Sequence, residues 1–176
     1  MNENLTPQLD YCKPVFLCGF MGCGKSTVGK KLSKLTGFDF VDLDRLIEQT
    51  QGKSIPEIFS EKGEEYFRRL ESDAIKGFSG KVIVALGGGA ILQKENAAAA
   101  KAQGAVVYIY TRFETCYRRI SGDSRRPLAA GSTRAELLER YKKRASVYEK
   151  AATVTVKGNS TPKLIAEEIC QKLNSL

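Results

Sequence analysis

The sequence of 176 residues contains no histidine. A metal site with histidine ligands is therefore excluded, and any proton transfer has to use a carboxylate, a lysine, a tyrosine or water. Because histidine is the side chain that most often exchanges protons near neutral pH, its absence argues against most hydrolases and metalloproteases.

The sequence also lacks the marks of exported and membrane proteins. No apolar run approaches the length that a membrane-spanning helix needs. The first residues, MNENLTPQLDYCK, show neither the basic start nor the apolar stretch of an export signal. The five cysteines are odd in number and include no Cys-x-x-Cys pair, which favours free thiols in a reducing compartment. We therefore expect a cytoplasmic protein with a flexible tail at 1–13 and a single domain at 14–176.

Positive charge is present in excess and is unevenly distributed. The formal net charge is +8, and residues 112–150 hold eleven Lys/Arg against five Asp/Glu, which places +6 of it there. Such clustering favours a polyanionic partner, either a nucleic acid or a small polyanion. A solvated basic surface explains some of these residues in either case.

Strand and helix patterns alternate along the chain. We predict strands at 15–20, 38–44, 81–86, 105–110 and 152–156, and helices at 25–37, 55–78 with a break at Gly63, 94–103, 114–120, 134–150 and 163–173. This order predicts an α/β fold with three layers, in which helices flank a central five-stranded parallel sheet. Ligands of such sheets bind beyond the carboxyl ends of the strands. Residues 121–133 lack periodicity and form a long loop, which we expect to act as a lid.

The stretch GFMGCGKST, residues 19–27, lies between the first predicted strand and the first predicted helix. It matches G-x-x-x-x-G-K-[ST], in which glycines let backbone N–H groups surround phosphate oxygens and the helix N-terminus adds its dipole. Lys25 is expected to reach the β- and γ-phosphates, and the Ser26 hydroxyl to bind Mg²⁺. A tight turn needs glycine but neither lysine nor serine, so the motif predicts a nucleotide site. Its expected members are Gly22, Cys23, Gly24, Lys25, Ser26 and Thr27.

Two carboxylates, Asp42 and Asp44, end the second predicted strand. Residues two apart in an extended segment point the same way, so both are expected at the binding edge, one holding Mg²⁺ and the other meeting a substrate hydroxyl. The alternative is a helix cap, for which aspartate is common. The third strand ends in no acid but in three glycines at 87–89, which shifts the metal-holding role to Ser26 and Asp42.

Arginines supply the remaining candidates. Arg68 shares a helix face with Glu71, which a surface ion pair of little energetic value would also explain. Arg144 lies beside two tyrosines on the predicted helix 134–150. A pair of fixed guanidiniums suits a planar carboxylate better than lysines do. Within the expected lid, the arginines at 125–126 could be delivered to a transferring phosphoryl group as the loop closes.

Taken together, these motifs resemble the shikimate kinase family. GxxGxGKST, DxD about seventeen residues after the lysine, FRxxE, LGGGA and RRPL occur in this order, and the resemblance runs from about Val15 to Leu173. It implies a single kinase domain with a P-loop NTPase-like fold of the nucleoside monophosphate kinase type. It also implies ATP-dependent phosphorylation of the 3-hydroxyl of shikimate, with Mg²⁺, on the route to chorismate and the aromatic amino acids.

The resemblance assigns roles to the acceptor residues. Asp44 would bind the hydroxyls of shikimate and act as the catalytic base, while Asp42 would hold Mg²⁺ with Ser26. The residues implied to bind shikimate are Asp44, Arg68, Gly87, Gly88, Gly89 and Arg144.

For the nucleotide, the resemblance implies that Arg126 contacts the ATP phosphates and that Arg119 lies near the adenine. Lys25 and Arg126 are the expected catalytic residues beside Asp44. A second adenine loop would correspond to about Asn159 to Pro162. The resemblance further suggests a monomer whose partner is a small molecule, with neither nucleic acid nor membrane as partner.

Three alternatives remain open from the sequence. A gluconate kinase or a nucleoside monophosphate kinase would share much of this pattern, since gluconate is also a polyhydroxy carboxylate. A basic nucleic-acid-binding module regulated by ATP would explain the charge at 112–150, although no nucleic-acid motif is visible. An inactive family member serving as a scaffold is the third, and the presence of all expected charged positions argues against it.

Overall fold

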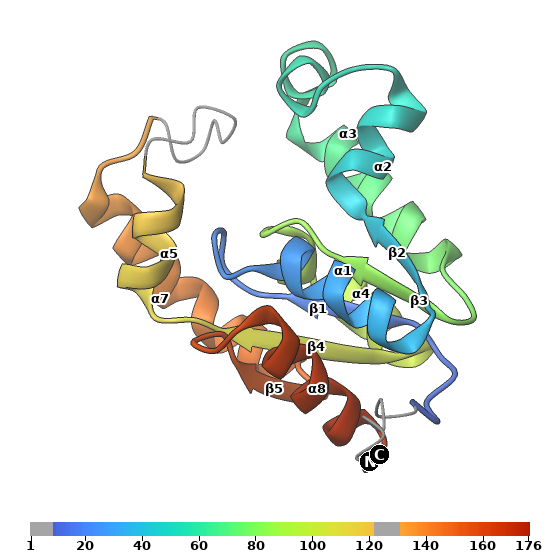
Figure 1. Cartoon of the computed structure of the whole chain (residues 1–176). Coiled ribbons are helices and arrows are strands. Elements are labelled where there is room, and N and C mark those ends of the chain that lie inside the picture. The colour runs from blue at the N-terminus through green and yellow to red at the C-terminus, as the bar shows by residue number, and fades with distance from the viewer. Residues whose placement is uncertain (1–8, 122–130) are drawn as a thin grey trace, which may run out of the picture.

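The computed structural model describes residues 9–121 and 131–176 (Figure 1). Five strands form one parallel sheet in the order β2-β3-β1-β4-β5. They are β1 (Val15–Cys18), β2 (Asp39–Asp42), β3 (Val82–Ala85), β4 (Ala105–Tyr110) and β5 (Val154–Lys157). The predicted five-stranded parallel sheet is confirmed.

Burial along the strands follows their place in the sheet. Every residue of β1 and β3 is buried, because central strands of a parallel sheet are covered on both faces. At one edge, β5 alternates between buried valines and the exposed Thr155 and Lys157. At the other edge, Asp39 begins β2 in an exposed position. The apolar or mixed composition of each strand therefore indicates whether it lies in the centre or at the edge of the sheet.

The helices form two layers around this sheet. They are α1 (Lys25–Thr36), α2 (Leu43–Gln51), α3 (Ile55–Gly77), the short 3₁₀ helix η1 (Ala90–Leu92), α4 (Lys94–Gln103), α5 (Phe113–Ile120), α7 (Arg134–Ala151) and α8 (Pro162–Leu173). α1 packs against α8 on one face, while α3, α4 and α7 lie together on the other (Figure 1). The predicted break at Gly63 is confirmed, since its φ of 79° interrupts α3. None of the helices in the described ranges combines the length and apolarity needed to span a bilayer.

Strand register brings three segments to one edge of the sheet. Leu17 of β1 and Asp42 of β2 both pair with Ala85 of β3, so the three strands end at the same level. The phosphate loop, the carboxylates and the three glycines therefore follow one another across the carboxyl edge. In Figure 1, α2 and α3 rise on one side of this edge and α5 and α7 on the other.

The part of the expected tail that the structure describes, residues 9–13, is anchored. Leu9 is buried in the core, and the backbone N–H of Asp10 donates a 3.0 Å hydrogen bond to Oδ1 of Asn174 beyond α8. The expected lid, 121–133, is described only at its two ends, and Arg126 lies outside the described residues. Downstream of it, Thr133 and Glu136 form a capping box that fixes the start of α7.

Candidate active site

The phosphate loop connects β1 to α1 through three glycines with positive φ. These are Gly19 at 144°, Gly22 at 78° and Gly24 at 103°, a region that residues with a β-carbon rarely adopt. A β-carbon on Gly22 would also lie 2.8 Å from the carbonyl oxygen of Cys116. The first turn of α1 contains no acidic residue. The N-terminal end of α1, with its helix dipole, therefore carries no competing negative charge in its first turn, which suits a phosphate.

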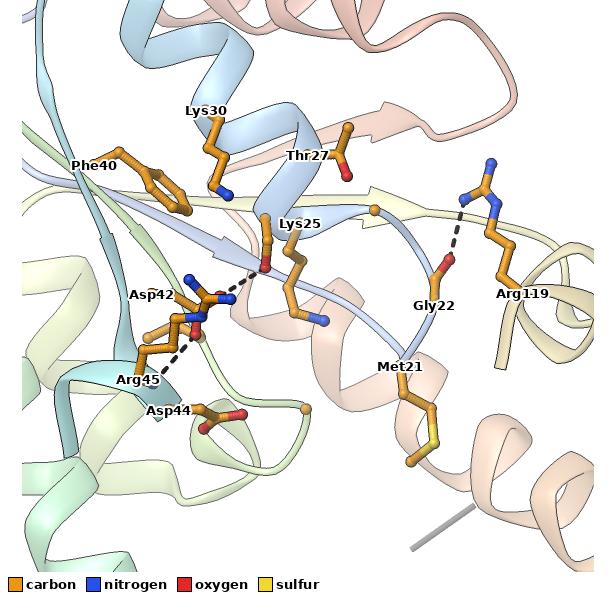
Figure 2. A pocket seen from close by; sticks show the side chains of 14 residues that line it. Met21, Gly22, Lys25, Thr27, Lys30, Phe40, Asp42, Asp44, Arg45 and Arg119 are labelled. Carbon is orange, nitrogen blue, oxygen red and sulfur yellow. Dashed lines mark hydrogen bonds between the residues drawn. The ribbon is translucent and has the colours of Figure 1, made fainter. Parts of the chain in front are cut away.

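Lys25 and Cys23 fill the inner side of this loop. The Lys25 ammonium donates hydrogen bonds of 2.9 Å and 3.3 Å to the carbonyl oxygens of Gly19 and Phe20. Figure 2 shows the lysine side chain extending from α1 toward Met21 and Asp44. Cys23 is buried inside the loop.

Asp42 joins β2 to the start of α1. Its Oδ2 accepts a 2.7 Å hydrogen bond from the hydroxyl of Ser26, and its Oδ1 accepts a long bond from the backbone N–H of Arg45 (Figure 2). The residue is therefore a helix cap for α2 and a pocket carboxylate at once, so the two interpretations of the sequence are compatible. Mg²⁺ prefers oxygen ligands and usually takes one or two from the protein, the rest coming from water and phosphate. The Ser26–Asp42 pair fits that donor set, and no cluster of three or more metal-binding side chains occurs within residues 9–121 and 131–176.

Asp44 reaches the pocket by a different route from the one expected. β2 ends at Asp42 and α2 begins at Leu43, so Asp44 lies in the first helical turn. The argument from two-residue alternation in a strand was wrong, because the cap at Asp42 starts the helix earlier. Both carboxylates nevertheless line the same cavity. Burial raises the pKa of Asp44, the neighbouring Asp42 raises it further, and Lys25 opposes both.

The glycines after β3 are packed against the candidate acceptor residues. A β-carbon on Gly87 would lie 2.6 Å from Oδ1 of Asp44, and one on Gly89 would lie 2.7 Å from Nη1 of Arg68. These distances are shorter than real contacts, so a side chain at either position would force Asp44, Arg68 or the glycine segment to shift. The backbone of this segment is thus approached closely by Asp44 and Arg68.

Arg68 is held by two glutamates on α3. Its Nη1 donates a 2.6 Å hydrogen bond to Oε2 of Glu71, and its Nη2 donates a 2.8 Å bond to Glu64. Glu71 is 1% exposed, so the interpretation of the Arg68–Glu71 pair as a surface ion pair is wrong. Burial raises the pKa of Glu71 to about 7, although Arg68 acts in the opposite direction. The second oxygen, Oε1, has no hydrogen-bond partner among the described residues and lies against the Gly87 backbone.

Arg144 approaches the same glycines from α7. Its Nη1 donates a 3.2 Å hydrogen bond to the carbonyl oxygen of Gly88. The hydroxyl of Tyr148, one helical turn further, donates a 2.6 Å bond to the same oxygen. Arg144 and Arg68 thus both adjoin the 87–89 segment, and they come from helices on opposite sides of the carboxyl edge.

Arg119 lies on the nucleotide side. Its Nη1 donates a 3.0 Å hydrogen bond to the carbonyl oxygen of Gly22, and the guanidinium lies close to Gly24 (Figure 2). Pro162, at the end of the expected adenine loop, lines a second hollow with Ser26 and Thr27. Both expected adenine neighbours therefore lie next to the phosphate loop.

One cavity of about 630 Å³ contains most of these groups. Its lining includes Lys25, Ser26, Asp42, Asp44 and Arg119.

Sequence reasoning missed several residues that line this cavity or support it. The missed lining residues are Met21, Lys30, Phe40, Arg45 and Leu86. Arg45 directly follows the DxD motif and Lys30 lies one turn after Ser26, and these positions were the available signals. Glu71 is a buried partner of Arg68, and the only signal for this in the sequence is that the two residues are three positions apart on a helix.

Comparison with known proteins identifies the family of this chain. The sequence model of one family, described as shikimate kinase, matches residues 21–174. A shikimate kinase from Persephonella marina is 42% identical over 156 residues, which cover 87% of this chain and 94% of that protein. A solved structure, a shikimate kinase from Acinetobacter baumannii in complex with shikimate, matches with a TM-score of 0.85 at 35% identity over 93% of each chain. A gluconokinase from Sinorhizobium meliloti, at 15% identity and a TM-score of 0.59 over 93% of this chain and 92% of that one, shares the fold alone. This chain belongs to the shikimate kinase family.

Proposed function

We propose that this chain transfers the γ-phosphoryl group of ATP to the 3-hydroxyl of shikimate, forming shikimate 3-phosphate and ADP. As a member of the shikimate kinase family, it is a kinase that uses ATP. The observation that carries the proposal is the convergence of Asp44, Arg68 and Arg144 on the three glycines at 87–89, beside the phosphate loop.

The acceptor half matches a small ring that bears one carboxylate and several hydroxyls. Arg68 and Arg144 approach the glycines from α3 and α7, and planar guanidiniums bind a carboxylate through paired N–H donors. Asp44 binds the reacting hydroxyl and accepts its proton as the oxygen bonds to phosphorus and the bond to the ADP oxygen breaks. Burial raises the pKa of Asp44, which makes it a better proton acceptor than an exposed aspartate.

The nucleotide half follows from the phosphate loop. Backbone N–H groups of the phosphate loop and of the first turn of α1 bind phosphate oxygens, and Lys25 moves from its loop carbonyls to the β- and γ-phosphates. Arg119 lies beside the loop, where it borders the base. Arg126 supplies a further guanidinium to the transferring group, so Arg126→Ala is expected to lower kcat strongly. An Arg126→Ala protein that kept full turnover and lost only ATP affinity would contradict that role.

Ser26 and Asp42 are the proposed Mg²⁺ residues. Their side-chain oxygens are joined by the 2.7 Å hydrogen bond, so both are within reach of one ion at the phosphate edge. Mg²⁺, when bound, neutralises charge on the phosphates and orients them for in-line transfer.

The test is ATP consumption with and without shikimate, followed by the same assay on Asp44→Asn. We expect ATP turnover to depend on shikimate and to fall by about a hundredfold or more in the variant, which keeps the shape but not the base. Gluconate and the nucleoside monophosphates serve as competing acceptors. If gluconate were turned over far faster than shikimate, the assignment of the acceptor would be wrong.

We further propose that the chain acts as a monomer in the cytoplasm. The support for a reducing compartment is that the five cysteines are odd in number and that no disulfide joins any two of them among the described residues. Light scattering coupled to size exclusion tests the monomer, and a stable dimer at assay concentration would overturn it.

A further inference from the structure

One helix, α7, reaches both halves of the active site through two buried or half-buried phenols. The Tyr148 hydroxyl donates a 2.6 Å hydrogen bond to the carbonyl oxygen of Gly88 in the acceptor half. The Tyr141 hydroxyl, about two turns earlier, donates a 2.9 Å bond to the carbonyl oxygen of Thr111. Arg144 lies between the two tyrosines on the same helix.

Tyr148 is a core residue in every respect except its hydroxyl. It is 1% exposed, and its ring packs against Tyr108 with a centroid separation of 5.5 Å. Phenylalanine would provide the same packing without a polar atom to desolvate. A buried hydroxyl is costly unless it is hydrogen-bonded, so its contribution lies in the bond to Gly88.

The hydrogen bond from Tyr148 affects the acceptor site through the carbonyl group of Gly88. The same oxygen accepts the 3.2 Å bond from Nη1 of Arg144, so two donors from one helix fix one peptide group. Both neighbouring glycines are in close contact with acceptor residues, Gly87 with Asp44 and Gly89 with Arg68. A rotation of this peptide would therefore displace Arg144 and disturb the contacts on either side.

We propose that Tyr148 is a positioning residue for the acceptor: its hydroxyl fixes the Gly88 carbonyl, which in turn holds Arg144 in place to bind the carboxylate of shikimate. Tyr148 does not touch the reacting atoms in this account and acts only through Gly88 and Arg144. The inference rests on the proposed function, because it names a residue that shapes the same acceptor site.

Tyr141 provides a matched control on the nucleotide side. Its ring packs edge-on against Phe20 of the phosphate loop, 5.2 Å between centroids. The carbonyl that it binds belongs to Thr111, whose hydroxyl donates a 3.3 Å bond to the carbonyl oxygen of Cys23 in that loop. Removing the Tyr141 hydroxyl deletes the same type of bond from the same helix, together with its contact to Tyr110, and the nucleotide loop is the affected neighbour.

The experiment compares Tyr148→Phe with Tyr141→Phe in steady-state kinetics, with calorimetric shikimate binding to the full chain. Loss of one neutral hydrogen bond corresponds to about a fivefold change in an equilibrium constant. We expect Tyr148→Phe to raise the KM and the Kd of shikimate by about fivefold while the KM of ATP stays within about twofold. Tyr141→Phe is expected to do the opposite: the KM of ATP should rise and the KM of shikimate should stay nearly unchanged. A purely structural role would lower the melting temperature without separating the two KM values.

Two further variants test the route through Arg144 and the need for a donor. In an Arg144→Lys background, Tyr148→Phe is expected to have little additional effect, because the two residues act as one unit. Replacement of Tyr148 by 4-aminophenylalanine keeps the ring and an N–H donor and is expected to restore shikimate affinity, a comparison that holds even if the phenylalanine variant folds poorly. A wild-type shikimate KM in Tyr148→Phe, or additive effects with Arg144→Lys, would overturn the proposal. Failure of the proposed function is distinct, since the unmodified protein would then show no shikimate-dependent ATP turnover.

Discussion

The Ser26 hydroxyl donates a 2.7 Å hydrogen bond to Oδ2 of Asp42, which joins the first turn of α1 to the carboxyl end of β2. The two residues are sixteen positions apart in the chain. In the sheet, β3 lies between β1, which leads into the phosphate loop before Ser26, and β2, which ends at Asp42. The bond places two oxygen ligands side by side next to the phosphate loop. Their proximity is the structural basis for the proposed Mg²⁺ site.

Asp42→Asn should weaken Mg²⁺ activation while sparing the fold. Asparagine caps helices as well as aspartate does, so the start of α2 should be retained. The lost anionic ligand is expected to raise the Mg²⁺ concentration needed for half-maximal rate by roughly tenfold or more. The measurement is a Mg²⁺ titration of the initial rate at fixed ATP and shikimate. Asp39→Asn, at the exposed start of the same strand, is the control and should behave as wild type.

Gly87→Ala should damage the acceptor site without weakening the nucleotide site. The added methyl group would lie 2.6 Å from Oδ1 of Asp44, so either the carboxylate or the glycine segment has to move. We expect kcat with shikimate to fall by about tenfold or more, with a nearly unchanged Kd for ADP. Gly77→Ala is the control, because nothing lies within 4 Å of its added β-carbon. Equal activity of the two variants would show that the tight packing at 87 is not needed.

Glu71 should make the folded state less stable as pH rises. Burial raises its pKa from an ordinary 4.5 to about 7, so between these values the folded protein keeps a proton that the unfolded chain releases. The contribution of Glu71 to the free energy of unfolding is fully present below pH 4.5 and is lost as pH rises toward about 7. Other carboxyls contribute with the opposite sign, such as Glu57 and Glu136, whose pKa values hydrogen bonds lower.

Denaturant unfolding of Glu71→Gln across that pH window isolates the effect. As pH rises, the unfolding free energy of wild type should fall relative to that of the Glu71→Gln variant. Glu64→Gln removes the other partner of Arg68 but leaves the buried carboxyl; because burial, not Glu64, is the main cause of the raised pKa of Glu71, this variant should retain most of the wild-type dependence. A pH-independent difference for Glu71→Gln would mean that this carboxyl is ionised throughout the window.

The sheet and the phosphate loop could be predicted because their signals are local. Apolar runs such as VFLC and VIVA indicate strands by themselves, and the loop combines glycines, a lysine and a serine within nine residues. The position of Asp44 could not be predicted by alternation, because β2 ends at Asp42, which caps α2, and the helix begins at the next residue. The end of the strand thus coincides with a helix cap, and the strand pattern predicted at 38–44 does not contain it.

The burial of Glu71 was equally hidden from local reasoning. A spacing of three predicts an ion pair with Arg68 on a helix face, but whether that face is covered depends on the glycines that follow β3. The contact of Tyr148 with Gly88 joins residues sixty positions apart, and no local pattern encodes it. The acceptor site is therefore a product of tertiary packing, whereas the nucleotide loop is a product of one motif.

Arg119→Ala should raise the KM of ATP but not that of shikimate, which is the opposite of what is expected for Tyr148→Phe. The guanidinium donates a 3.0 Å hydrogen bond to the carbonyl oxygen of Gly22 and lines the cavity beside the phosphate loop. Its removal is expected to raise the KM of ATP by about fivefold to tenfold and to leave the KM of shikimate unchanged. Arg118→Ala removes the same charge from the exposed neighbouring position on α5 and controls for the general basic field. If both variants raised the KM of ATP equally, and added salt abolished the difference from wild type, Arg119 would act through long-range charge instead of through its contact with the loop.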